Sequence, residues 1–292
     1  MIIQKFESQV DNECHFIPST AHLCYISATI GSGKTVLMLS MLRDKEFYYQ
    51  KFNNVIVINP NYASDSKWSS LIGKPVMIPN KKLLMEILKE KLNDLNKIGS
   101  AGSKGGSTNH RRLFKTKYQE LISELYTLQN TNTLQFTEAN FRETIDMNYI
   151  KMLIERQKSI SKEYSPDHRD KILIMLDDCL AFKKVLKSED FINLIVSLRH
   201  NNITLCIASQ EYKQFPRLLR NNAMVKIYFD IHNIDILRDV WTEGAMTDNK
   251  FEVFYNNFKK AIQSKPHSFI TTNLYNDMEH RCSLNFNEFI KL

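Results

Sequence analysis

The sequence predicts an α/β fold in which a mostly parallel sheet is flanked by helices. Short, continuous apolar runs, typical of strands buried on both faces, alternate along the chain with segments of helical period. One such run starts at Leu23 and breaks into a glycine-rich turn, and another, Lys171 to Leu176, ends in two carboxylates. Strands that alternate with helices in this way form doubly wound sheets, which bind ligands at the carboxyl ends of their strands.

Further strands are predicted wherever an apolar or β-branched run is bounded by turn residues. These runs are Asn54–Ile58, Val76–Ile78, Asn202–Ser209, Val225–Phe229 and Ser268–Leu274. Apolar residues spaced three and four apart predict helices between the strands. Those segments lie near Val36–Arg43, Ser188–Arg199, Ile234–Trp241 and Lys250–Ile262.

Composition and charge limit the classes of protein that fit. The chain has 292 residues, of which 43% are hydrophobic, enough for one large α/β domain or for a domain with a sizeable insertion. A net charge of +7 permits a polyanionic partner without requiring one. The five cysteines lack metal-ligand spacing, and no apolar run reaches the roughly 20 residues that span a bilayer. We therefore expect an intracellular protein with reduced thiols and no membrane partner.

Residues 28–35, A-T-I-G-S-G-K-T, have the pattern of a phosphate-binding loop between a strand and a helix. Glycines let backbone N–H groups close around phosphate oxygens, while Lys34 supplies a positive charge and Thr35 a hydroxyl for Mg²⁺. The phosphate-binding residues we predict are Thr29, Ile30, Gly31, Ser32, Gly33, Lys34 and Thr35. Ala28 stands where such loops open with glycine, and we expect it to restrict how the loop leaves the strand. The alternative is a glycine turn that binds no ligand.

Asp177 and Asp178 follow an apolar strand, where a magnesium–nucleotide site needs carboxylates. One carboxylate would hold the metal through water and the other would orient the attacking water. We assign the first role to Asp177 and the second to Asp178. Gln210 directly follows another predicted strand, and its amide can hydrogen-bond both the γ-phosphate and that water, so we predict a sensor. The alternative is that all three are ordinary polar residues at strand ends.

Residues 81–165 are predicted to form a helical insertion in a core made of residues 1–80 and 166–292. Apolar residues of helical period predict one helix from Lys81, a second from about Arg111 to Leu128 and a third over Thr137–Lys162. A flexible Gly/Ser-rich loop, residues 99–108, separates the first two. Basic residues in and after this loop can track a phosphate backbone, or they belong to an ordinary solvated loop. The candidate DNA-binding residues are Lys104, Arg111, Arg112, Lys115 and Lys117.

Four segments together resemble the FtsK–HerA superfamily of additional-strand, RecA-like P-loop ATPases, and within it the poxvirus-type genome-packaging ATPases of large DNA viruses and virophages. The segments are A-T-I-G-S-G-K-T (28–35), I-L-I-M-L-D-D (172–178), S-L-R-H-N-N-I-T-L-C-I-A-S-Q (197–210) and L-L-R-N-N-A-M-V-K-I-Y-F (218–229). The resemblance implies a ring-forming motor, a pentamer or hexamer, that hydrolyses ATP with Mg²⁺ and pushes double-stranded DNA into a preformed capsid. It also implies a capsid or portal partner, and a location in the host cytoplasm, the viral factory or the virion.

The resemblance assigns roles to single residues. It implies that Lys34 and Thr35 bind phosphate and Mg²⁺, that Asp177 coordinates the metal and that Gln210 is the sensor. Asp178 stands where many superfamily members have a catalytic Glu, and its side chain is one methylene shorter.

The resemblance also implies that Arg199 reaches into the site of a neighbouring subunit and stabilises charge on the transferring phosphoryl group. Arg217 and Arg220 are rival candidates for this arginine finger. Arg199 also has a simpler alternative as a cation at the end of a helix.

Other functions share parts of this pattern. A conjugation or segregation motor of the same superfamily would have the same core motifs. A nucleotide-binding structural or switch protein with weak hydrolysis would fit the departures at Ala28 and Asp178. A GTPase is disfavoured because no N-K-x-D segment is present to recognise guanine.

Overall fold

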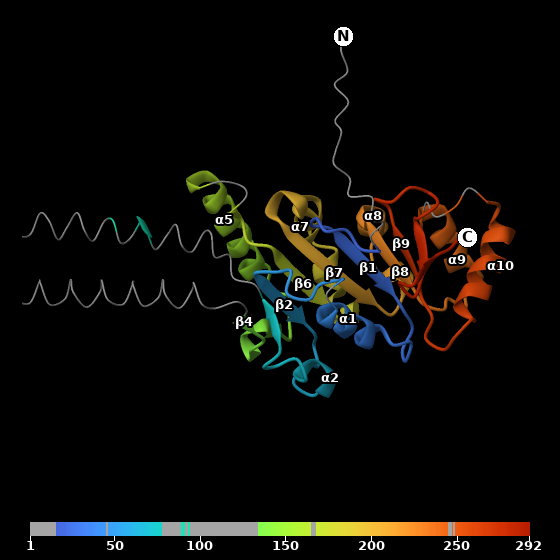
Figure 1. The fold of residues 1–292 in the computed structure, drawn as a ribbon, viewed down its shortest axis with the longest axis horizontal. Coiled ribbons are helices and arrows are strands. Elements are labelled where there is room, and N and C mark those ends of the chain that lie inside the picture. Colours follow the sequence, from blue (N-terminus) through green and yellow to red (C-terminus); the bar gives the residue numbers. More distant parts are fainter. Residues whose placement is uncertain are drawn as a thin grey trace, which may run out of the picture. The chain divides into compact units, whose positions relative to one another are not determined.

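The computed structural model describes residues 16–44, 46–77, 89–90, 93, 134–164, 168–244, 247 and 249–292. Their strands form a mixed, mostly parallel sheet flanked by helices, which confirms the predicted α/β class (Figure 1). The strands are β1 (Leu23–Ser27), β2 (Asn54–Ile58), β3 (Pro75–Met77), β4 (Leu134–Gln135), β5 (Phe141–Arg142), β6 (Ile172–Leu176), β7 (Ile203–Ser209), β8 (Val225–Tyr228), β9 (Ile270–Asn273), β10 (Cys282–Leu284) and β11 (Glu288–Phe289).

The helices connect these strands. The α-helices are α1 (Lys34–Arg43), α2 (Ser66–Ser69), α5 (Met147–Glu163), α6 (Lys183–Leu186), α7 (Glu189–Ser197), α8 (Arg217–Asn222), α9 (Ile234–Gly244) and α10 (Phe251–Ile262). Short 3₁₀ helices are η2 (Glu138–Asn140), η4 (Cys179–Phe182), η5 (Arg199–Asn201) and η6 (Tyr212–Gln214). No helix in the described part of the chain is long and apolar enough to cross a membrane.

The chain divides into two compact units. The first consists of residues 1–37, 176–199 and 204–292. Its strands follow the order β11-β10-β9-β8-β1-β7, with β1 parallel to both β7 and β8. From β8 to β11, neighbouring strands pair antiparallel, and β9, β10 and β11 extend the sheet beyond β8. Of these three added strands, the sequence predicted only β9. All five residues of β1 and all seven of β7 are buried, as expected of central strands.

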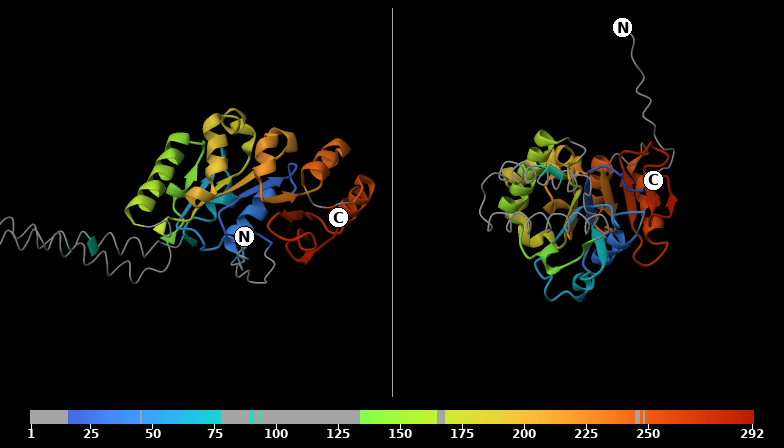
Figure 2. Two further views of the ribbon diagram at one scale, coloured as in Figure 1. Left: turned by 90° about the horizontal axis from the view of Figure 1, so that it is seen from above. Right: turned by 60° about the vertical axis from the view of Figure 1, so that its left-hand side comes forward.

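Helices cover the strands of the first unit and supply its aromatic core. Figure 2 shows α7 and α8 on one face of β1, β7 and β8. Helix α9 packs against α10, and the apolar faces of both are buried at Leu237, Val240, Phe254 and Phe258. Under α8, the ring of Phe215 stacks on that of Tyr25, with centroids 4.8 Å apart. The unit therefore has its own apolar core around β1.

The second unit consists of residues 38–175 and 200–203. Strand β2 is parallel to β5, and β3 pairs with β4 in a separate two-stranded sheet. The predicted helix over Thr137–Lys162 is wrong at its start, because Phe141–Arg142 forms β5. Asp146 then caps α5 by accepting hydrogen bonds from the N–H groups of Asn148 and Tyr149. The helical period of α5 was predicted, but its cap and the preceding strand were not.

Most of the predicted insertion, residues 81–165, lies outside the described residues. The Gly/Ser-rich loop 99–108 and the candidate DNA-binding residues belong to this part, so they stay predictions. Of its described residues, Phe141 and Arg142 pair with β2, and Leu134–Gln135 pairs with β3. The end of the insertion thus supplies strands as well as a helix.

A buried histidine just before β1 makes the stability of the first unit depend on pH. His22 is 2% exposed, and its Nδ1 lies 2.7 Å from the carbonyl oxygen of Thr20. Burial lowers the pKa of His22 from 6.5 to about 4, the hydrogen bond to Thr20 raises it, and repulsion from Arg199 lowers it. Between those two pKa values the unfolded chain binds more protons than the folded chain, so acid favours unfolding.

We predict that the free energy of unfolding falls by about 3 kcal/mol on account of His22 as the pH drops from about 6.5 to about 4. Denaturant melts across this range measure the fall. The His22→Asn variant, whose amide can still donate to Thr20, should show a shallower pH dependence. His280→Gln, at a half-exposed histidine paired with Asp277, is the control. Equal pH slopes in His22→Asn and the parent protein would contradict the prediction.

Candidate functional site

Three strand ends of the first unit meet at one edge of the sheet. In the parallel register Ser27 of β1 lies opposite Ser209 of β7 and opposite Tyr228 of β8. The predicted phosphate-binding loop, Gln210 and the segment after β8 therefore leave the sheet at the same edge. This is the edge where open α/β sheets bind ligands.

The loop between β1 and α1 has the backbone of an anion cradle. Gly31 and Gly33 have φ angles of +77° and +102°, which side-chain-bearing residues rarely adopt. The Ser32 hydroxyl donates to the carbonyl oxygen of Thr29 over 2.7 Å and closes the turn. Lys34 and Thr35 are the first residues of α1, so the positive end of the helix dipole lies at the loop. The predicted residues thus form one closed turn that leads into the start of α1.

Ala28 does not strain this loop. Its N–H donates to the carbonyl oxygen of Ser209 over 3.0 Å, and its methyl group is buried. The non-glycine residues with positive φ in the described part of the chain are Gln50, Asp178, Asn202, His267, Asn285 and Phe286. Because Ala28 is not among them, its backbone conformation is one that side-chain-bearing residues adopt without strain.

Thr35 and Asp177 place hard oxygen ligands beside the loop. The Thr35 hydroxyl donates to Asp177 Oδ2 over 2.8 Å, and the Asp178 N–H donates to Asp177 Oδ1 over 2.9 Å. Asp177 is 1% exposed, and these two hydrogen bonds hold its buried carboxylate in place. One carboxylate and one hydroxyl suit Mg²⁺, which usually binds few protein oxygens and fills its shell with phosphate and water. No cluster of three metal-binding His, Cys, Asp or Glu residues lies in the described chain.

Asp178 and Gln210 meet next to this pair. Gln210 Nε2 donates to Asp178 Oδ1 over 2.5 Å. Asp178 has φ 55° and ψ 54°, a left-handed conformation that short polar side chains such as Asp and Asn tolerate best. This backbone gives a physical reason for Asp where related motifs have Glu. Non-glycine residues persist in such conformations mainly at functional sites, so the carboxylate is a candidate for chemistry.

Arg199 lies at the other end of β7 from Gln210. It starts η5, just after α7, and its guanidinium lies over the ring of Tyr275, 5.0 Å from the ring centroid. Strand β7 separates it from Gln210 by roughly 20 Å, from a rise of about 3.3 Å per residue. Arg199 is therefore distant from the cradle of its own chain. A role as an arginine finger in a neighbouring subunit stays a prediction, as does its alternative role at the helix end.

The two rival arginines differ sharply in exposure. Arg220 has 7% of its side chain exposed and binds Glu243 with two hydrogen bonds, Nε to Oε2 over 2.8 Å and Nη2 to Oε1 over 2.9 Å. Such a buried, bidentate pair is structural. Arg217 has 74% of its side chain exposed, with Nε 3.3 Å from Glu243 Oε1. Of these two residues, only Arg217 is accessible to a neighbour.

Glu243 fixes the segment that follows Gln210. Its Oε2 also accepts a hydrogen bond from the Tyr212 hydroxyl over 2.7 Å, and Tyr212 lies two residues after Gln210. Burial raises the pKa of Glu243, but the hydrogen bonds from Arg220 and Tyr212 outweigh burial and leave the pKa below its ordinary value. The carboxylate is therefore charged, and it ties α8 and α9 to the segment next to Gln210.

We predict that Glu243→Gln lowers the free energy of unfolding by about 3 kcal/mol, because it leaves the buried Arg220 charge uncompensated. Denaturant unfolding measures the loss. Glu279→Gln is the matched control, since Glu279 and its partner Lys291 are 73% and 78% exposed and such pairs contribute little. Equal losses in the two variants would show that the Glu243 network does not stabilise the fold.

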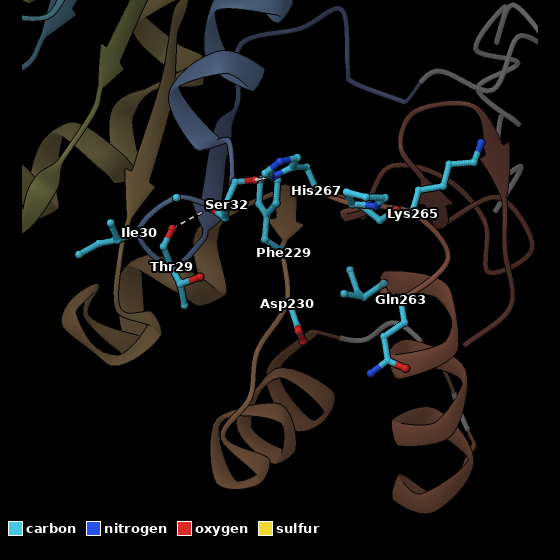
Figure 3. Close-up of a pocket in the computed structure, with 12 residues that line it drawn as sticks. Thr29, Ile30, Ser32, Phe229, Asp230, Gln263, Lys265 and His267 are labelled. Carbon is cyan, nitrogen blue, oxygen red and sulfur yellow. Dashed lines mark hydrogen bonds between the residues drawn. The ribbon is translucent and has the colours of Figure 1, made fainter.

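One contact of the loop was missed from the sequence. His267 Nδ1 lies 3.0 Å from the carbonyl oxygen of Ser32, so the segment between α10 and β9 touches the phosphate loop (Figure 3). A methyl group at Gly33 would lie 3.7 Å from the His267 ring. Ser32 and His267 are 235 positions apart in the sequence, and no local sequence pattern indicates their contact. Only the predicted strand at Ser268–Leu274 indicated that this segment returns to the sheet.

The structure thus combines an α/β fold with a glycine-rich loop between β1 and α1 and a hydrogen-bonded Thr35–Asp177 pair beside it. No protein family model and no curated protein sequence matches the chain. Its fold is similar to that of B204, the DNA-packaging ATPase from Sulfolobus turreted icosahedral virus (TM-score 0.47, 11% identity, 91% of this chain and 98% of that one covered). It is also similar to the genome-packaging NTPase B204 from Sulfolobus turreted icosahedral virus 2 in complex with ATP-gammaS. The TM-score is 0.46 and the sequence identity 11%, with 92% of this chain and 98% of that one covered.

A third similar structure is the N-terminal domain of zonular occludens toxin from Neisseria meningitidis, with a TM-score of 0.33, 14% identity, and 73% of this chain and 78% of that chain covered. The two viral proteins are named as genome-packaging enzymes.

Proposed function

We propose that this chain is an ATP-driven motor that translocates double-stranded DNA, and that its task is to package a viral genome into a preformed capsid. The observation that carries the proposal is the cluster of Thr35, Asp177, Asp178 and Gln210 at the phosphate loop. A protein that only bound phosphate would need the loop and not this second set of side chains. The DNA and capsid parts of the proposal are supported by the sequence resemblance and by the basic residues of the insertion.

Each side chain has a part in hydrolysis. The loop N–H groups and Lys34 bind the phosphates, and Thr35 and Asp177 would hold Mg²⁺. When bound, the ion neutralises charge on the β- and γ-phosphates. Asp178 orients a water molecule and accepts its proton as the water oxygen attacks the γ-phosphorus, and ADP leaves with the bridging oxygen. Gln210 donates to Asp178 Oδ1, so a γ-phosphate that attracts the amide would free the carboxylate.

The proposed assembly is a ring of five or six subunits in which an arginine of one chain completes the site of the next. Arg199 is the candidate that the resemblance names, and Arg217 is the exposed rival. Mixing Lys34→Ala subunits with subunits that lack one arginine tests this assignment. Recovery of hydrolysis at mixed interfaces identifies the arginine that acts in trans.

Translocation is tested by displacement of a triplex-forming strand from duplex DNA, with ATP and Mg²⁺. The proposal predicts strand release that requires ATP hydrolysis and duplex on the entry side. Binding of DNA without strand release would contradict it.

The proposed DNA contact through the insertion has its own test. Neutralising Lys104, Arg111, Arg112, Lys115 and Lys117 together should weaken duplex binding and flatten its salt dependence. An unchanged salt slope would remove the insertion from the DNA site.

A further inference from the structure

We propose that a cavity beside the phosphate loop binds the nucleoside part of the nucleotide, and that the His267 ring forms one of its walls. The cavity, of about 510 Å³, lies between Thr29–Ser32 and the segment that joins α10 to β9 (Figure 3). This inference rests on the proposed nucleotide site and adds the part of the ligand that the phosphate cradle leaves out.

The direction in which the ligand must extend is set by the strand order. Strand β1 lies between β7 and β8. The groups that would act on the γ-phosphate include Gln210, directly after β7, and Asp178, which is hydrogen-bonded to it. A nucleotide whose γ-phosphate faces Gln210 extends its nucleoside away from β7. On that side Phe229 and Asp230 follow β8 and Ser268 precedes β9, and all three line the cavity.

The cavity has the size and the chemistry for a nucleoside. Sites for small organic ligands are commonly about 300–1,000 Å³ and combine apolar walls with a few polar groups. Phe229, Ile262 and Pro266 supply apolar surface for the faces of a base. Gln263 and Asp230 supply an amide and a carboxylate that can bind ring and exocyclic nitrogens or ribose hydroxyls.

His267 is fixed where it joins this cavity to the cradle. Because the Ser32 carbonyl can only accept, Nδ1 of the neutral ring carries the proton in their 3.0 Å contact. The ring then lies beside Gly33, where an added methyl group would be 3.7 Å from it, an ordinary contact distance. His267 has φ 60°, a strained conformation for a residue with a side chain, and such strain is retained mainly at functional sites. A ring that lines a cavity next to a phosphate-binding loop can bind a base by stacking on its face.

A second cavity, of about 430 Å³, also borders the loop, but it lies on the wrong side for a nucleoside. Its lining includes Ala28 and Thr29 together with Gln210, Tyr212 and His232. It therefore opens next to the sensor, at the γ-phosphate end of the proposed ligand. His280, a half-exposed histidine that pairs with Asp277 and lines neither cavity, is therefore the matched control for His267.

The experiment measures the Kd of ATP and of inorganic tripolyphosphate, each with Mg²⁺, for the full chain and three variants. His267→Asn removes the ring but keeps an amide donor for Ser32 and suits a left-handed backbone. We expect it to weaken ATP binding about tenfold, or about 1.4 kcal/mol, and to change tripolyphosphate binding less than twofold. Lys34→Ala should weaken both ligands, and His280→Ala neither. Melting curves of each variant report folding.

Three results would overturn the inference: equal losses of affinity for ATP and tripolyphosphate in His267→Asn, no loss of ATP affinity in that variant, or a selective loss of ATP affinity in His280→Ala. The first would mean that His267 acts only through Ser32. A parent protein that binds neither ligand would refute both this inference and the proposed function. A protein that binds ATP through His267 but does not hydrolyse it would refute the motor alone.

Discussion

Lys34→Ala is expected to lower the rate of ATP hydrolysis by about a thousandfold, because it removes the one charged side chain of the phosphate loop. Lys34 lies at the start of α1, where its ammonium group and the helix N–H groups would share the β- and γ-phosphates. The charge on those phosphates grows as the bond to the leaving ADP breaks, so the loss falls mainly on the transition state. Phosphate release from ATP measures it.

Lys260→Ala is the matched control, since Lys260 is an exposed lysine in the last turn of α10. It should leave the hydrolysis rate unchanged. If Lys34→Ala hydrolyses ATP as fast as Lys260→Ala, the loop from residue 28 to residue 35 is not the hydrolytic site.

Asp178→Asn should lower hydrolysis by about a hundredfold to a thousandfold while ATP binding stays within about threefold, because the amide cannot accept the proton of the attacking water. Asparagine has the same shape and suits the left-handed backbone at this position. Rates and binding constants measured on one preparation give both quantities. A loss of affinity that equals the loss of rate would point to a binding role instead.

Two further variants sharpen the Asp178 prediction. Asp235→Asn changes an exposed aspartate in the first turn of α9 and should have no effect. Asp178→Glu keeps the carboxylate but lengthens it and suits the left-handed backbone less well, so we expect an intermediate rate. A rate above that of the parent protein would mean that the short side chain at position 178 limits hydrolysis.

The central strands and the cradle could be predicted because their signals are local. A buried parallel strand is continuously apolar, and a glycine-rich turn with Gly-Lys-Thr has few other uses, so β1, β2, β6, β7 and β8 were found close to their observed bounds. The meeting of Thr35 and Asp177 follows from the rule that parallel strands end at one edge. The structure adds the 2.8 Å distance between the Thr35 hydroxyl and Asp177 Oδ2 and the burial of Asp177, on which a metal-binding role depends.

Features that depend on distant contacts could not be predicted. The strands β10 and β11 are short and mixed in composition, and they form because β10 pairs with the edge of β9 and β11 pairs with β10. The contact of His267 with Ser32 and the pairing of Arg220 with Glu243 join residues far apart in the sequence. The left-handed Asp178 depends on the turn that leads into η4, which the strand pattern does not encode.

The most direct test of the account is phosphate release by the purified full chain with ATP and Mg²⁺, measured with and without duplex DNA. We predict steady turnover that rises several-fold with duplex DNA and stops when the metal is chelated. ATP binding at the cradle with no phosphate release in either condition would contradict the motor, and would identify the chain as a nucleotide-binding switch.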